Sequence, residues 1–292
     1  MQIELNKMPA FGVAGNFTGH LEQAGEAGDF ANVITKEQNA PKAIFPTYIP
    51  LQNAIANKNK IDGIPSYLKV FPFDSQKIVF PQGQQNLQVE SECAIICDAV
   101  WESTDNGKKL KELKPIAFGA SNDCSIRKEG AKKISEKKNW GSSSKGLSEN
   151  LIPIESFDSS SKINDYRIAS YLLRNGKLIE YGENSAVRDY SYMYAKLLDW
   201  MVEKFNCQRC EGPAENIGEY LAVAGYPSQI MVSIGATRYT DFGEHNYLAN
   251  GDVAVIILYN EKHYSKEQIE KMLLAGDLCN DEISFLKQKI QL

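Results

Sequence analysis

The sequence lacks any apolar run long enough to cross a membrane. Its longest apolar stretches, residues 93–96 and 253–258, fall far short of the ~20 residues that a membrane helix needs. Residues 1–17 contain no cationic leader followed by an apolar core, so no secretory signal is expected. Positive charge is not in excess either, because the net charge is −5 and the pI about 5.4. We therefore expect a cytoplasmic protein that takes neither nucleic acid nor a membrane as its partner.

The chain has six cysteines but no pattern typical of a disulfide framework. Cys207 and Cys210 form the single C-x-x-C pair, and no second pair follows at the spacing of a structural zinc site. The scattered thiols favour a reducing compartment.

Composition and periodicity predict one α+β, mostly β domain. Of the 292 residues, 43% are hydrophobic and 24% charged, values typical of a globular protein. Strands outnumber helices in the apolar pattern, and Asn175-Gly176 marks a tight hairpin turn. The expected strands cover residues 77–80, 88–97, 166–181 (a hairpin), 220–223, 230–234 and 253–259, and the expected helices cover residues 190–205 and 265–275.

We divide this single domain, residues 1–292, into three regions. Residues 1–75 are expected to form an N-terminal loop and helix region, with a connecting excursion at residues 51–75. Residues 76–260 are expected to form a β core, and residues 261–292 a C-terminal helical tail. The basic run at residues 128–138 fits either a solvated helix or a lid loop.

Glu90-Ser-Glu92 is the first candidate for chemistry. On a strand these two carboxylates point to the same face. Two carboxylates at such a short distance raise each other's pKa unless a cation offsets their charge. Hard divalent cations do so because they take oxygen ligands. The alternative is that both side chains lie on the solvent face of an amphipathic strand.

Four segments in order resemble motifs of the fumarylacetoacetate hydrolase family. Residues 12–20 match G-V-G-x-N-Y-x-x-H, and residues 89–96 match the E-x-E strand. Residues 122–127 match N-D-x-S-x-R, and Trp140 followed by Lys145 matches a tryptophan–lysine segment. The resemblance covers most of the chain and implies a mixed β-sheet roll or sandwich with short peripheral helices, commonly a homodimer.

The resemblance also implies a site. Glu90, Glu92 and Asp123 would bind Mg²⁺ or Mn²⁺, with Ca²⁺ possible in a crystal, and the substrate would be a small β-dicarbonyl or 2-oxo acid. Lys145 would contact a substrate oxygen, although an exposed lysine explains it equally well. The remaining expected roles are acid–base chemistry for His20, helped by Glu22, and substrate contacts for Arg127, Gly235 and Thr237.

Several departures from the family pattern fall in the catalytic segments. The H-x-x-E dyad that activates water becomes His20 and Gln23, and an amide is no base. The late T-G-T-P turn becomes Ile234-Gly-Ala-Thr237. The expected function is therefore a metal-dependent hydrolase or lyase. The alternatives are an isomerase or tautomerase, or a silent protein that binds metal and ligand. His245 and Glu244 are the reserve candidates for a base.

Overall fold

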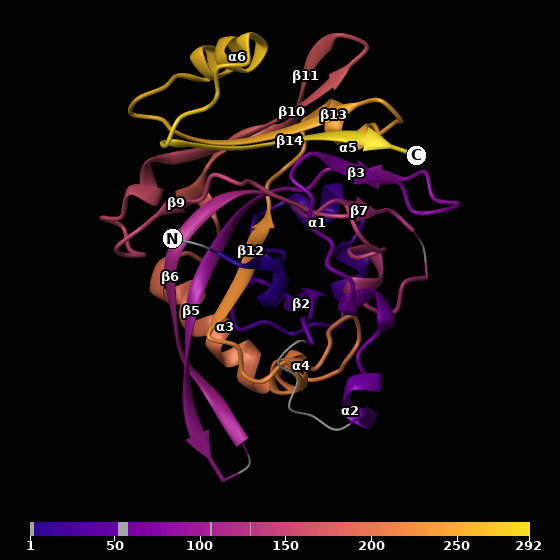
Figure 1. Ribbon diagram of the computed structural model, residues 1–292, viewed down its shortest axis with the longest axis vertical. Helices are drawn as coiled ribbons and strands as arrows, with labels where there is room; N and C mark the ends of the chain where they lie inside the picture. Colours follow the sequence, from indigo (N-terminus) through magenta and orange to yellow (C-terminus); the bar gives the residue numbers. More distant parts are fainter. Residues whose placement is uncertain (1–2, 52–57, 106, 129) are drawn as a thin grey trace.

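The computed structural model describes residues 3–51, 58–105, 107–128 and 130–292. This part of the chain forms curled β-sheets flanked by short helices (Figure 1), which confirms the expected α+β, mostly β fold. Residues 52–57 of the expected excursion lie outside the described residues. The remainder of the excursion carries α2 (Lys58–Asp62) and the 3-10 helix η3 (Ser66–Lys69).

The largest sheet is built on one long antiparallel hairpin, which runs down one side of Figure 1. Strands from the N-terminal region add to it, so residues 1–75 contribute two strands as well as loop and helix. In spatial order the strands are β2 (Ala43–Tyr48), β1 (Ala10–Ala14), β12 (Gln229–Ala236), β5 (Ser91–Thr104), β6 (Gly107–Asn122) and β8 (Gly146–Leu147), with β9 (Ile152–Pro153) also paired to β6.

The second sheet lies across the top of the molecule in Figure 1 and packs against the upper part of the large sheet. The predicted hairpin is present, and Asn175 and Gly176 have φ angles of 52° and 75°, as the tight turn requires. The expected helical tail is wrong in part, because its last residues alternate buried and exposed and pair as a strand within this sheet. The strand order is β11 (Lys177–Ala186), β10 (Tyr166–Arg174), β13 (Val253–Asn260), β14 (Ile283–Gln291) and β3 (Lys77–Val79).

Helix α3 (Tyr194–Cys207) begins later than the expected residue 190. Asn16 explains the delay, since its amide side chain hydrogen-bonds the backbone N–H and C=O of Tyr192 and holds that residue outside the helix. Residues 220–223, expected as a strand, belong to helix α4 (Ile217–Val223), whose first turn is capped by Asn216.

The terminal helix α6 (Lys266–Ala275) is confirmed, with the predicted capping box between Ser265 and Gln268. No helix in the described ranges is both long and apolar enough to span a bilayer. The remaining short elements are α1 (His20–Gln23), α5 (Asp241–His245), and the 3-10 helices η1 (Leu5–Lys7), η2 (Ala27–Phe30), η4 (Ile134–Lys137), η5 (Lys162–Asp165) and η6 (Val187–Asp189).

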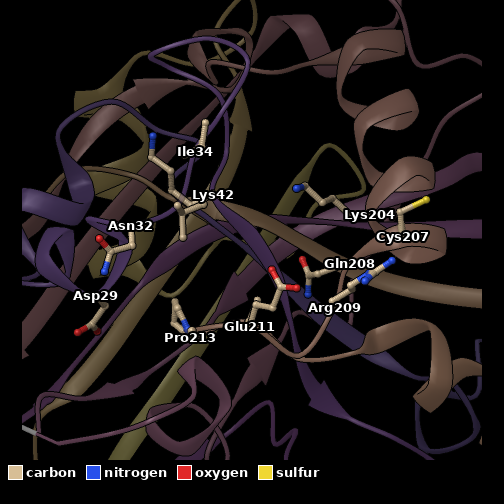
Figure 2. A pocket seen from close by; sticks show the side chains of 13 residues that line it. Asp29, Asn32, Ile34, Lys42, Lys204, Cys207, Gln208, Arg209, Glu211 and Pro213 are labelled. Carbon is tan, nitrogen blue, oxygen red and sulfur yellow. The ribbon is translucent and has the colours of Figure 1, made fainter.

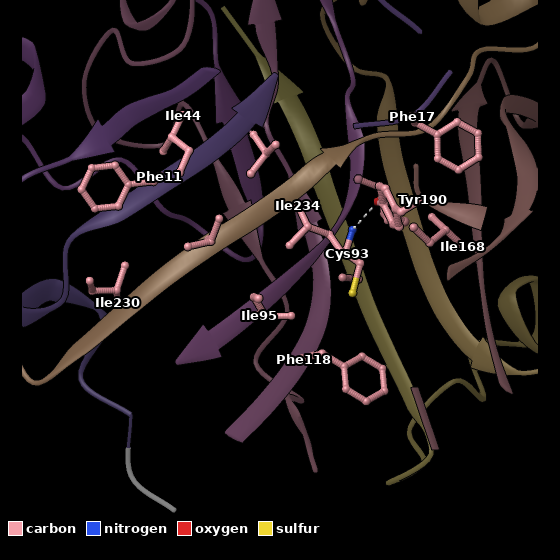
Figure 3. Packing of buried hydrophobic residues seen from close by; sticks show 14 of the residues in the cluster. Phe11, Phe17, Ile44, Cys93, Ile95, Phe118, Ile168, Tyr190, Ile230 and Ile234 are labelled. Carbon is pink, nitrogen blue, oxygen red and sulfur yellow. Dashed lines mark hydrogen bonds between the residues drawn. The ribbon is translucent and has the colours of Figure 1, made fainter. Parts of the chain in front are cut away.

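The main hydrophobic core lies against the large sheet (Figure 3). Phe11 from β1 meets Phe205 from α3 edge to face, with ring centroids 4.9 Å apart. The Cys93 backbone N–H donates to the Tyr190 hydroxyl at 3.3 Å, which joins β5 to the segment before α3. Burial raises the pKa of the Cys93 thiol, so this cysteine is an inert part of the core.

The basic run at residues 128–138 is not a solvated helix. Its described part is a loop that contains η4, and its last two residues turn inward. Lys137 and Lys138 are only 8% and 2% exposed, whereas Lys132 is exposed. Fully buried lysines need partners, and those partners lie at the candidate site.

Candidate metal centre

Two paired strands break at the same place, and the break holds two carboxylates. Beyond β5 and β6 the two chain segments pair again as β4 (Leu87–Gln88) and β7 (Ser125–Ile126). The register is continuous, because Ser91 faces Asn122 on one side of the break and Gln88 faces Ser125 on the other. Glu90 and Asp123 therefore lie opposite each other, and the Asp123 backbone N–H donates to the Glu90 carbonyl at 3.0 Å.

Glu92 joins them from β5, two residues along the same strand. The ligand oxygens of Glu90, Glu92 and Asp123 all lie within 4.8 Å of one another. Each of the three residues is at most 2% exposed. The sequence prediction that these carboxylates converge is confirmed by the geometry.

Three buried cations surround the carboxylates. Lys138 Nζ lies 2.5 Å from Glu90 Oε2 and 2.9 Å from Asp123 Oδ2. Lys145 Nζ lies 2.9 Å from Asp123 Oδ1 and donates to the Cys124 carbonyl. Lys145 is 1% exposed, so the surface-lysine alternative is wrong. Within the described residues, Glu92 forms no ion pair.

Arg127 reaches the centre from β7 but is occupied by protein groups. Its guanidinium lies 2.7 Å from Glu90 Oε1 and 2.8 Å from Glu26 Oε1. It also donates to Gln88 Oε1 at 2.6 Å and to the Tyr239 hydroxyl at 2.9 Å. These partners occupy the N–H donors of the guanidinium, so Arg127 holds Glu90 and Glu26 in place rather than facing open space.

His20 faces the same carboxylates from the start of α1. It is 4% exposed and lines a small cavity together with Glu90, Glu92 and Lys138. Its Nδ1 is buried and has no hydrogen-bond partner among the described residues. Burial, which outweighs the charge of Glu90, lowers the pKa of His20, so the imidazole is neutral near pH 7.

The expected helper of His20, Glu22, is not brought to this cavity. Glu22 is exposed and lines a separate surface depression. Glu26 points inward instead, where it pairs with Arg127. Gln23, at the dyad position, donates to the Tyr239 carbonyl at 3.1 Å and to Glu244 Oε2 at 2.9 Å, so it ties α1 to α5.

The two late-turn residues have structural partners. Gly235 has φ of +123°, and its N–H donates to Glu92 Oε2 at 2.9 Å. The Thr237 hydroxyl lies 3.0 Å from the Ser91 hydroxyl. Of the reserve bases, Glu244 accepts from Gln23, and His245 is exposed on α5.

The pKa values of Glu90 and Glu92 are shifted in opposite directions. Burial acts to raise the pKa of Glu90, but Lys138 and Arg127 outweigh it and hold that pKa well below its usual range. Burial raises the pKa of Glu92 well above the usual range, and the charges of Asp123 and Glu90 raise it further. The centre thus contains one firmly ionised carboxylate beside one that favours its proton.

The residues fit a hard divalent ion. Oxygen ligands on opposite sides of Mg²⁺ at about 2.1 Å are about 4.2 Å apart, so this set needs little contraction. Glu90 Oε1 and Asp123 Oδ2 meet cations at ion-pair distance without hydrogen-bond geometry, which leaves lone pairs free for another cation. The raised pKa of Glu92 also marks a site that is short of positive charge at that carboxylate.

Space at the centre is nevertheless scarce. The cavity beside His20 and the carboxylates measures about 20 Å³, room for roughly one water. A cavity of about 790 Å³ lies elsewhere, between the η2 region and the segment after α3 (Figure 2). It is lined by mixed charges such as Lys42, Arg209 and Glu211, and contains none of the expected site residues.

Comparison with known proteins places the chain in a family. The model of a family of unknown function (DUF5718) matches residues 26–290. The chain belongs to this family. A search of curated protein sequences gave no significant match.

The DUF5718 chain has the fold of fumarylacetoacetate hydrolase family proteins, as its motifs predict. It matches a putative fumarylacetoacetate isomerase/hydrolase from Oleispira antarctica with TM-score 0.52 and 12% identity over 97% of this chain and 93% of that one. A yeast fumarylacetoacetate hydrolase family protein gives TM-score 0.52 and 12% identity over 98% and 94%. A 2-keto-3-deoxy-D-arabinonate dehydratase complexed with magnesium and 2,5-dioxopentanoate gives TM-score 0.51 and 13% identity over 97% and 72%.

Sequence reasoning missed Lys138 in this DUF5718 protein. The run around it suggests solvent exposure because Lys132, Lys133 and Lys137 precede it. Trp140, two residues after Lys138, donates from its indole to the Val79 carbonyl at 2.8 Å, a contact that appears only in the folded chain.

Proposed function

We propose that this DUF5718 protein is a Mg²⁺- or Mn²⁺-dependent enzyme that acts on a small 2-oxo acid or β-dicarbonyl compound. One observation carries the proposal. Three buried carboxylates, Glu90, Glu92 and Asp123, converge at a strand break and are faced by a neutral His20, whose Nδ1 has no hydrogen-bond partner among the described residues. The magnesium-bound dehydratase of the same fold adds support, since its complex contains a small oxo compound.

The site residues would have distinct roles in such a reaction. Glu90, Glu92 and Asp123 would hold the ion, which when bound would stabilise negative charge that develops on the substrate oxygens. Lys145 lies beside Asp123 and brings an ammonium toward the substrate oxygens on that side. The neutral imidazole of His20 is suited to accept a proton from the substrate carbon or from water.

Enolisation without activated water is a second candidate, favoured by the contacts of Gln23. The residue at the dyad position is an amide, and it is fixed by Tyr239 and Glu244. Glu26, the nearby carboxylate that points inward, is held by Arg127. Among the described residues, no carboxylate hydrogen-bonds His20 Nδ1 to orient it for water activation, which suits an isomerase or tautomerase better than a hydrolase.

Substrate assays with the Mn²⁺-loaded protein test these alternatives. Cleavage of oxaloacetate or an acylpyruvate supports the hydrolase or lyase. Deuterium exchange at C3 of 2-oxobutyrate without cleavage supports the isomerase. Oxalate binding without either reaction leaves a silent binding protein. The control is Glu92→Gln, which removes one proposed ligand. Absence of Mn²⁺ binding at Glu90, Glu92 and Asp123 would contradict the proposal.

A further inference from the structure

In the described part of the chain, Lys138 is the one buried cation at ion-pair distance from two of the proposed ligands. Its ammonium lies 2.5 Å from Glu90 Oε2 and 2.9 Å from Asp123 Oδ2. The side chain is 3% exposed, and its Nζ lies 5.0 Å from the centre of the Phe45 ring. The ammonium therefore lies between carboxylates from the two opposed chain segments of the strand break.

The backbone that carries Lys138 is fixed on both sides. Before it, the Ser135 hydroxyl donates to Glu215 Oε1 at 2.8 Å and lies 2.9 Å from the Tyr67 hydroxyl. After it, Asn139 donates from its side-chain amide to the Thr47 carbonyl at 2.8 Å and the Val70 carbonyl at 3.1 Å. These anchors leave the lysine side chain, rather than the loop, as the part that can swing.

Two of the three proposed ligands already have cations at ion-pair distance. Lys138 and Arg127 contact Glu90, and Lys138 and Lys145 contact Asp123. A divalent ion added beside these cations would place further positive charge in a buried site, which is costly unless a resident cation withdraws.

We propose that Lys138 is a tethered cation that occupies the position of the divalent ion and competes with it. Metal binds only when the Lys138 ammonium moves away from Glu90 and Asp123, so the lysine sets the metal affinity and keeps the centre closed in its absence. The cavity of about 20 Å³ beside these residues agrees with a filled site. This inference rests on the proposed metal dependence and adds a regulatory element to the same site.

Mn²⁺ titration of the full chain, followed by the electron paramagnetic resonance signal of free Mn²⁺, tests the proposal. Lys138→Met removes the ammonium and keeps an unbranched side chain, and it should bind Mn²⁺ at least tenfold more tightly than the wild-type chain. Lys132→Met, a change to an exposed lysine of the same run, should match the wild type. Lys138→Arg, which keeps the charge, should retain weak binding.

A second neutral variant keeps the test possible if the first one misfolds. If Lys138→Met is insoluble, Lys138→Gln provides the same comparison, and the rise in melting temperature on adding Mn²⁺ provides a second measurement. Equal or weaker Mn²⁺ affinity in the neutral variants would overturn the role of Lys138 while leaving the proposed function intact. Tight binding by the neutral variants alone would support the role of Lys138 and overturn the proposed metal dependence of the wild-type chain. No binding by any variant would refute both.

Discussion

Glu215 is a buried carboxylate beside η4, outside the metal centre. Its Oε1 accepts the Ser135 hydroxyl at 2.8 Å, and its Oε2 has no hydrogen-bond partner in the described part of the chain. Burial raises the pKa of Glu215 to about 7. The folded chain therefore keeps a proton at pH values where the unfolded chain has lost it.

This proton makes stability depend on pH. The contribution of Glu215 is fully present below about pH 4.5 and is lost as the pH rises through about 7. The loss amounts to about 3 kcal/mol, at 1.36 kcal/mol per pKa unit. Glu215→Gln should remove this dependence, so its free energy of unfolding should change less between pH 5 and pH 8 in urea denaturation. The exposed Glu211→Gln should keep the wild-type slope, and an identical slope in Glu215→Gln would contradict the assignment.

Lys145 offers a test of substrate binding that is separate from metal binding. Its ammonium pairs with Asp123, and it faces away from solvent. Lys145→Met should weaken oxalate binding to the Mn²⁺-loaded protein by roughly tenfold, the value of one charge-assisted hydrogen bond of 1.5 kcal/mol or so. Mn²⁺ affinity should not fall, because the change removes a competing positive charge. Isothermal titration of both ligands checks this, and unchanged oxalate affinity would return Lys145 to a structural role.

The site residues differ in how well the sequence alone predicts their positions. Glu90, Glu92 and Asp123 were predictable because strand periodicity and motif order both point to them. Lys138 was not, since its direction depends on anchors at Thr47 and Glu215, which are distant in the sequence. Local patterns report which residues share a face, whereas long-range anchors decide which lysine of a run turns inward.

The bulge in β12 is an element on which the centre depends. The register of β12 against β5 shifts between Ser233 and Ala236, and Gly235 within the shift has φ of +123°. A Cβ at Gly235 would lie 3.1 Å from Asn16 Cβ, and the backbone conformation itself disfavours side chains. The same residue donates its N–H to Glu92, so the bulge fixes one carboxylate.

Gly235→Ala should therefore affect both stability and the site. We expect a loss of about 1–3 kcal/mol in the free energy of unfolding, the typical cost of a strained backbone position. Mn²⁺ affinity should fall too, since the Glu92 carboxylate loses its fixed orientation. Gly28→Ala is the matched control, because a Cβ there meets no atom within 4 Å. Wild-type values of both quantities in Gly235→Ala would show that the bulge is irrelevant to the centre.

Elements with clear turn or cap chemistry were predicted well. The short apolar runs at residues 230–234 and 253–259 are strands as expected, whereas the run at residues 220–223 is helical. The hairpin around Asn175-Gly176 and the capped helix at Ser265 were predictable, because each has turn or cap chemistry. Residues 220–223 fit either period, and the Asn216 cap that starts α4 lies outside the run. The C-terminal tail was mistaken because the helix at its start was extended through residues 276–282 into the alternating strand β14.

At the scale of the whole molecule, β14 ties the end of the chain to the metal centre. It pairs with both β13 and β3. Its Gln288 accepts from the Asn122 side chain at 2.9 Å and donates to the Lys145 carbonyl at 3.2 Å. The last strand therefore supports residues next to Asp123 from behind.

Removal of residues 283–292 should prevent folding, because it leaves β13 unpaired on one side and Gln288 absent. Circular dichroism and thermal melting should show no cooperative transition. Removal of Leu292 alone, which is 81% exposed, should change the melting temperature little. A cooperative transition and retained Mn²⁺ binding in the longer truncation would show that the tail is an appendage.

The continuous register through the strand break makes the metal centre a reporter of folding. Glu90 and Asp123 meet only if the long β5–β6 hairpin closes in one alignment, since a slip of one residue turns every side chain of a strand to the opposite face. Misaligned intermediates therefore have no centre at all. Quenching of the protein's own fluorescence by Mn²⁺ during refolding would therefore report when the hairpin finishes closing. No attached label would be needed.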